Sequence, residues 1–138
     1  MDRPEPAALV RTVVRIPGKL SREFSGSLDS VVSARRFVVA ALEAGGYGVV
    51  ADDAALVVTE LAANAVIHAR SDFTVTVTPG PDRVRISVRD RTELPEAGDD
   101  TALPAEPLHG LGAVAAMAVR WGVAPNGSSK DVWAELRR

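Results

Sequence analysis

Two alternating segments separated by a short turn constrain the fold of this chain more than any other feature. Residues 73–79 read FTVTVTP and residues 83–90 read RVRISVRD, with the turn residues GPD between them. Successive side chains of a strand point to opposite faces, so this alternation predicts an antiparallel hairpin with one apolar and one polar face. Other elements must then cover the apolar face.

Three segments have the apolar spacing of helices that could cover such a face. The first spans residues 27–45 and ends at a pair of glycines, which commonly terminate helices. A second helix is predicted from about residue 52 to residue 69, and a third over residues 110–120. Further strands are expected at residues 9–16, 120–125 and 131–137.

The resulting order β-α-α-β-β-loop-α-β-β predicts an α+β fold. It is a two-layer α/β sandwich in which a mostly antiparallel, mixed sheet carries three helices on one face. The 138 residues suit one core, so we assign residues 9–138 to a single domain that follows a flexible tail, residues 1–8. Residues 91–109 contain three prolines and many acids without periodicity, and a loop of this length is usually functional or disordered.

Composition excludes several classes of function. The formal net charge of −2 gives no electrostatic footprint for nucleic acid. The absence of cysteine excludes disulfides and thiolate metal sites, and two histidines argue against a zinc site. No apolar run approaches the roughly 20 residues of a membrane span, and the N-terminus lacks the apolar stretch of a signal peptide. We therefore expect a soluble, cytoplasmic protein.

The second predicted helix carries a line of polar side chains, Glu60, Asn64 and His68, at four-residue spacing. At roughly 100° per residue, Glu60 lies at the edge of the apolar face that includes Val57 and Leu61. Asn64 and His68 fall successively nearer the centre of that face. A carboxylate at the border of a core needs water, a metal or a ligand nearby. The alternative is a solvated Glu60 beside a hydrogen-bonded core amide and a core-edge histidine.

The segment DDAALVVTELAANAVIHA resembles the N-box helix of the GHKL superfamily, the Bergerat-fold ATPases. This superfamily includes gyrase, chaperone, histidine-kinase and mismatch-repair ATPases and the small anti-sigma-factor serine kinases. The resemblance implies that Glu60 acts as the catalytic base. It also implies that Asn64 holds the Mg²⁺ ion that bridges the ATP phosphates. One helical turn between the two would let the metal hold the phosphates while the carboxylate orients or deprotonates the attacking group.

Two further segments follow in the order of that superfamily, and the resemblance extends over residues 20–137. RVRISVRDRTELP is similar to the G1 box of the actinobacterial anti-sigma-like subgroup, which implies that Asp90 accepts the adenine amino group. For Asp90 alone, the alternative is a turn residue at the end of a strand. HGLGAVAAMAVRWGV resembles the G2 box, in which glycines before a helix N-terminus let the backbone approach phosphate. ATP contacts are thereby implied for His109, Gly110, Leu111 and Gly112.

Three departures from the superfamily pattern favour weak ATP binding. Leu108 stands where active members usually have glycine, and a branched side chain there restricts the backbone and crowds a phosphate. Asp131 stands where the subgroup commonly has threonine, and we expect this second carboxylate close to Asp90, where the two charges repel. Residues 91–109, which would form the ATP lid, are rich in acids.

Three functions remain open. The first is a serine/threonine kinase of the anti-sigma type, which binds a sigma factor or an anti-sigma antagonist and phosphorylates a serine of the antagonist with Mg²⁺ and ATP. The second is a degenerate domain that regulates a protein partner by docking, with weak or no ATP binding. A stand-alone ATP hydrolase is less favoured, because hydrolysing members normally have larger domains to drive. A homodimer could form through the exposed side of the sheet or the first helix.

Overall fold

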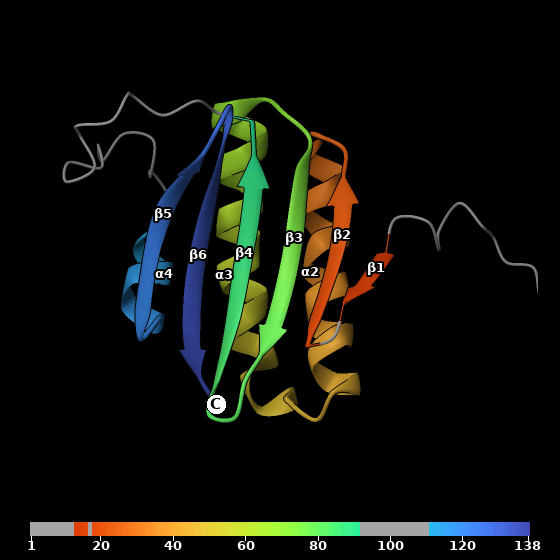
Figure 1. The fold of residues 1–138 in the computed structure, drawn as a ribbon, viewed down its shortest axis with the longest axis vertical. Helices are drawn as coiled ribbons and strands as arrows, with labels where there is room; N and C mark the ends of the chain where they lie inside the picture. The colour runs from red at the N-terminus through yellow and green to blue at the C-terminus, as the bar shows by residue number, and fades with distance from the viewer. Residues whose placement is uncertain (1–12, 17, 92–110) are drawn as a thin grey trace, which may run out of the picture.

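The computed structural model describes residues 13–16, 18–91 and 111–138, which form one sheet with helices against it (Figure 1). Its six strands lie in the order β1-β2-β3-β4-β6-β5, and all five pairings between them are antiparallel. The predicted α+β sandwich of two layers is confirmed. The strands are β1 Val13–Ile16, β2 Lys19–Phe24, β3 Phe73–Pro79, β4 Arg83–Asp90, β5 Arg120–Asn126 and β6 Ser129–Arg137.

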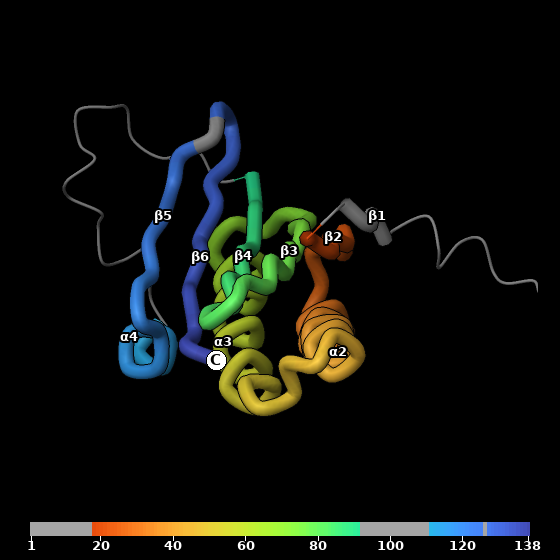
Figure 2. The backbone as a smooth tube through the Cα atoms, turned by 60° about the horizontal axis from the view of Figure 1, so that its bottom comes forward, coloured from red at the N-terminus to blue at the C-terminus, as the bar shows by residue number. Residues whose placement is uncertain are grey.

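The described residues include three α-helices, which form the second layer on one side of the sheet (Figures 1 and 2). The two longer helices pack against each other, and the shortest packs against α3 and β5. A 3₁₀ turn, η1, joins α2 to α3, and a π-helical turn, η2, continues α3. The bounds are α2 Leu28–Ala44, η1 Gly48–Val50, α3 Ala51–Asn64, η2 Ala65–Ala69 and α4 Gly112–Met117.

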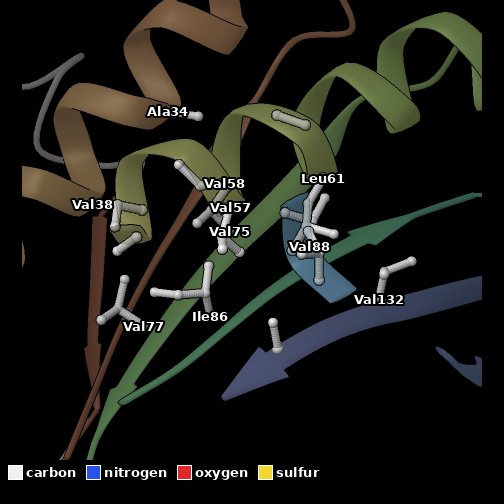
Figure 3. Close-up of a cluster of buried hydrophobic side chains, with 14 of the residues drawn as sticks. Ala34, Val38, Val57, Val58, Leu61, Val75, Val77, Ile86, Val88 and Val132 are labelled. Atoms are coloured by element: carbon white, nitrogen blue, oxygen red, sulfur yellow. The ribbon is translucent and has the colours of Figure 1, made fainter. Parts of the chain in front are cut away.

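The hydrophobic core lies between the sheet and the helices (Figure 3). In β3 and β4 every second side chain is buried, as the alternation of the sequence predicts, and both strands have the predicted bounds. Helix α3 meets these strands with Val57, Val58 and Leu61, which are all buried. The opposite face of the sheet carries threonine, serine and arginine, so this hairpin has one covered face and one open face.

The N-terminal part of the sheet differs from the prediction. The sequence predicts one strand at residues 9–16 and none at residues 19–24, whereas β1 and β2 form a hairpin there. Residues 9–12 lie outside the described residues. Gly18 has a φ of +78°, which glycine adopts readily, so the chain turns there and continues as a second strand. Because β2 also pairs with β3, this hairpin adds two strands to the sheet.

The end of the second helix also differs from the prediction. His68 is exposed, so the expectation that it lies further inward than Asn64 is wrong. The reason is that residues 65–69 form a π-helical turn, and the 100° rotation per residue of an α-helix does not apply there. Arg70 then takes a left-handed conformation with a φ of +54°, and the helix ends.

The third helix is shorter than predicted. It spans Gly112–Met117, whereas the sequence predicts residues 110–120. The backbone N–H of Val119 already donates a hydrogen bond to the carbonyl oxygen of Glu135 on β6, so the chain has joined the sheet before β5 begins. None of the helices in the described ranges is long and apolar enough to cross a membrane.

Candidate functional site

Glu60 and Asn64 lie one turn apart on α3, at the border of the face that packs on the sheet. Asn64 is 4% exposed, whereas the Glu60 side chain is half-buried. Their helical neighbours Val57 and Leu61 are fully buried against the sheet, and this packing fixes the rotation of the helix. The predicted position of the polar pair at the edge of the core is therefore observed.

The Glu60 carboxylate contacts the first turn of α4. Its Oε1 atom accepts a hydrogen bond of 3.2 Å from the backbone N–H of Val114. Backbone N–H groups in the first turn of a helix have no acceptor within that helix, and a negative charge there is favoured by the helix dipole. Glu60 thus joins α3 to the helix that follows the predicted G2 segment.

Two of the four residues predicted to contact ATP in the G2 segment are described. Leu111 is buried and immediately precedes α4, and Gly112 is exposed at its start. A Cβ atom added to Gly112 would meet no atom within 4 Å, so the space beside this residue is open. His109 and Gly110 lie outside the described residues, as does Leu108.

Arg91 is the only residue of the predicted ATP lid that is described, since residues 92–109 lie outside the described ranges. Its side chain is exposed, and a terminal guanidinium nitrogen lies 3.7 Å from a carboxylate oxygen of Asp72. Its backbone N–H donates a 3.1 Å hydrogen bond to the Ser71 hydroxyl. These contacts attach the first lid residue to the connection between η2 and β3.

Asp90 ends β4 on the face of the sheet that the helices cover. It continues the buried series of Val84, Ile86 and Val88, so it lies on the same side of the sheet as Asn64. Its carboxylate is 2% exposed and accepts a 2.7 Å hydrogen bond from the ammonium of Lys130, which is 1% exposed. The two residues are direct partners in the register of β4 and β6. Asp90 therefore has a buried counter-ion.

Asp131 does not approach Asp90, and the expected repulsion between these carboxylates is wrong. Adjacent residues of a strand point to opposite faces, so Asp131 lies on the open face, where its Oδ1 atom is 2.9 Å from Nε of Arg89. The residue that faces Asp90 is Lys130, whose role the sequence reading missed. The burial of Val132 two positions further along β6 places Lys130 on the covered face.

The open face of the sheet carries a network of one carboxylate and three arginines. Glu135 on β6 lies 2.9 Å from Arg85, 3.2 Å from Arg120 and 3.4 Å from Arg83. The hydrogen bond from Arg85 holds the pKa of the Glu135 carboxyl below its usual value, against the opposing effect of burial. The Arg85 guanidinium also lies 4.1 Å from the centre of the Trp133 ring.

Metal binding by this site would depend on the nucleotide. The described residues contain no cluster of three or more acidic or histidine side chains that could hold a metal ion. A magnesium ion at Asn64 would therefore take most of its ligands from phosphate oxygens and water, as is common for Mg²⁺ in nucleotide sites.

A comparison with protein-family models supplies the decisive observation. Residues 24–127 match the model of the histidine kinase-like ATPase domain. The chain belongs to this family. The matched range contains α3, β4 and α4, and with them Glu60, Asn64 and Asp90, so the resemblance to the GHKL superfamily is confirmed. Membership of the histidine kinase-like ATPase domain family implies ATP binding. A search of curated proteins found no match.

The described residues suit the phosphates of ATP better than they suit its adenine. At the phosphate end, Asn64 offers an amide oxygen for Mg²⁺ and Glu60 a carboxylate one turn away. At the adenine end, the carboxylate implied to accept the amino group already accepts a hydrogen bond from Lys130. The family thus implies ATP, whereas the residue that the resemblance assigns to base recognition, Asp90, is bonded to Lys130 within the protein.

Proposed function

We propose that this protein is an ATP-binding regulator that acts as a serine/threonine kinase of the anti-sigma-factor type. It would bind a sigma factor or an anti-sigma antagonist and phosphorylate a serine of the antagonist. The observation that carries the proposal is the pair of Glu60 and Asn64 on one face of α3, at the edge of the core and beside α4. In these roles the pair would supply a proton acceptor one helical turn from a metal ligand.

When bound, ATP would supply the phosphoryl group that is transferred, and Mg²⁺ would neutralise the charge on the phosphates. Asn64 would bind the metal through its side-chain oxygen, which the buried position of the residue holds in place. Glu60 would accept the proton of the serine hydroxyl on Oε2, while the bond from Val114 N–H to Oε1 fixes the orientation of the carboxylate. Both roles use side chains held by helices, which favours a constant distance between base and metal.

A second candidate, a docking regulator with weak or no ATP binding, is favoured by one observation. The Asp90 carboxylate is paired with Lys130 in the interior, so the carboxylate that the family resemblance assigns to adenine recognition already has a counter-ion within the protein. Regulation would then depend on contact with a protein partner alone. The two candidates differ in whether substitutions at Glu60 and Asn64 change partner phosphorylation.

A phosphoryl-transfer assay with three variants separates these candidates. Glu60→Gln keeps an oxygen that can accept the Val114 bond but removes the proton acceptor, so transfer should fall about 10²–10⁴-fold with nucleotide affinity nearly intact. Asn64→Ala should weaken Mg²⁺-dependent nucleotide binding itself, because it removes a metal ligand. Glu43→Ala, which removes an exposed carboxylate from α2, is the matched control. Partner binding without transfer, unchanged in all three variants, would favour the docking regulator.

A further inference from the structure

The buried pair of Asp90 and Lys130 has a consequence for which purine the site accepts. We infer that Lys130 is a specificity-determining residue that lowers the affinity of the nucleotide site for adenine relative to a 6-oxopurine. This inference rests on the nucleotide binding proposed above. It starts from the 2.7 Å bond between the Lys130 ammonium and the Asp90 carboxylate, at a point where both side chains are almost completely buried.

The ammonium of Lys130 and the amino group of adenine are both hydrogen-bond donors toward the carboxylate of Asp90. A lysine ammonium carries three hydrogen-bond donors and no acceptor, and the amino group at position 6 of adenine is likewise a donor. The carboxylate of Asp90 is acceptor-only when ionised. The Lys130 ammonium already donates to Oδ2 of Asp90, so the amino group would have to use other acceptor sites of this carboxylate, beside a cation that offers it no acceptor.

The position of Lys130 is fixed by the sheet and not by a flexible surface contact. Lys130 lies directly opposite Asp90 on β6, and its partner on the other side is Pro125 of β5. A buried ammonium separated from its counter-ion loses both its hydration and its charge partner, which is strongly unfavourable. The pair is therefore expected to persist when the phosphate end of the site is occupied.

A purine with an oxygen at position 6 has the opposite chemistry at that position. The 6-carbonyl of hypoxanthine is an acceptor, so it can receive a hydrogen bond from the Lys130 ammonium where the amino group of adenine cannot. Inosine triphosphate has the same ribose and triphosphate as ATP. Comparing the two nucleotides therefore isolates the contribution of the 6-substituent.

Calorimetric titration of the unmodified protein with each nucleotide and Mg²⁺ tests the inference without any substitution. We expect ATP to bind no more tightly than inosine triphosphate, because the amino group meets a carboxylate that is already paired with a donor-only cation. ATP binding about tenfold or more tightly, the effect of a hydrogen bond to a charged group, would overturn the inference.

The variant Lys130→Thr tests the same inference by releasing Asp90. ATP affinity should rise by about 10-fold to 100-fold, the range for one hydrogen bond to a charged group, whereas affinity for inosine triphosphate should not rise. Asp131→Thr, at the neighbouring position on the open face, is the matched control and should change neither affinity. Circular dichroism and thermal melting establish that each variant is folded. An equal rise for both nucleotides, or no rise for either, would contradict a role in base selection.

The outcomes also separate this inference from the proposed kinase. If the unmodified protein selects ATP and transfers phosphate, the inference about Lys130 is wrong and the kinase proposal stands. If neither the protein nor the folded Lys130→Thr variant binds either nucleotide at millimolar concentration, nucleotide binding fails and the inference fails with it. Selective gain of ATP affinity by Lys130→Thr supports both.

Discussion

Two neighbouring positions of the same strand pair carry ion pairs in very different surroundings. Arg89 and Asp131 pair on the open face of the sheet, with side chains 54% and 27% exposed. Asp90 and Lys130 pair on the covered face, with side chains 2% and 1% exposed. The shortest nitrogen–oxygen distances are similar, 2.9 Å and 2.7 Å. Strand alternation alone therefore places one pair in solvent and the next in the core.

The contrast shows that the surroundings of an ion pair, more than its geometry, decide what it contributes. Water screens the exposed pair, and such pairs typically contribute about 0–1 kcal/mol to stability. In the interior both charges lose hydration, so the pair is a weak source of net stability, but loss of one partner leaves a buried charge uncompensated. We therefore expect very different responses to single substitutions.

Breaking the buried pair should have the largest effect. Lys130→Met keeps a long apolar side chain but leaves the Asp90 carboxylate without its counter-ion, which should lower the free energy of unfolding by about 3–5 kcal/mol. Urea denaturation measures this loss. Lys19→Met, at an exposed lysine on β2, is the matched control and should change stability little. A loss of less than about 1 kcal/mol would mean that the buried pair behaves like an exposed one.

The charge network around Glu135 should give an intermediate, pH-dependent effect. Glu135→Gln should lower the free energy of unfolding by about 1 kcal/mol at neutral pH, because it weakens hydrogen bonds from arginines that are themselves partly exposed. The folded-state pKa of Glu135 is lowered, chiefly by Arg85. Its stabilising contribution is thus full above the unfolded pKa of about 4.3 and is lost as the pH falls through the folded pKa. Urea titrations at several pH values should show the variant and the parent converging in acid; a constant difference would contradict this assignment.

The exposed pair should give the smallest effect. Arg89→Ala and Asp131→Ala should each lower the free energy of unfolding by no more than about 1 kcal/mol. The hydrogen bond to Asp131 raises the pKa of the Arg89 guanidinium, which stays charged over the accessible pH range. A double-mutant cycle gives the coupling energy of the pair, and high salt should reduce it further. Coupling as strong as that of the buried pair would remove the distinction between the two faces.

The sequence predicts most of the fold because apolar residues recur at strand and helix spacing on the surfaces that meet in the core. Strands β3 and β4 and helix α2 lie where the alternation and the apolar spacing place them. Strand β2 is not predicted because Arg22 stands between Leu20 and Phe24 and interrupts the apolar alternation of its inward face. Arg22 is tolerated there since its guanidinium lies 4.9 Å from the centre of the Phe24 ring. A cation that stacks on an aromatic ring cannot be distinguished from a solvated one by periodicity.

The sequence predicts the part of the candidate site on α3 better than the part on the sheet. Glu60 and Asn64 are separated by one helical turn, so their proximity follows from local geometry. The pairing of Asp90 with Lys130 joins residues 40 positions apart, and it depends on a register that the whole sheet sets. His68 could not be placed because the sequence carries no clear signal for a π-helical turn.

Because Arg85 stacks on Trp133, the intrinsic fluorescence of this tryptophan can report changes on the open face of the sheet. The chain has two tryptophans, and β5 and β6 present them to opposite sides of the sheet. Trp133 lies under a guanidinium on the open face, whereas Trp121 packs against the hydrophobic core. A macromolecule that settles on the open face changes the water around Trp133, and a rearrangement of the interior changes the environment of Trp121. In a variant with one tryptophan replaced by phenylalanine, all tryptophan emission comes from the remaining one, and therefore from one side of the sheet.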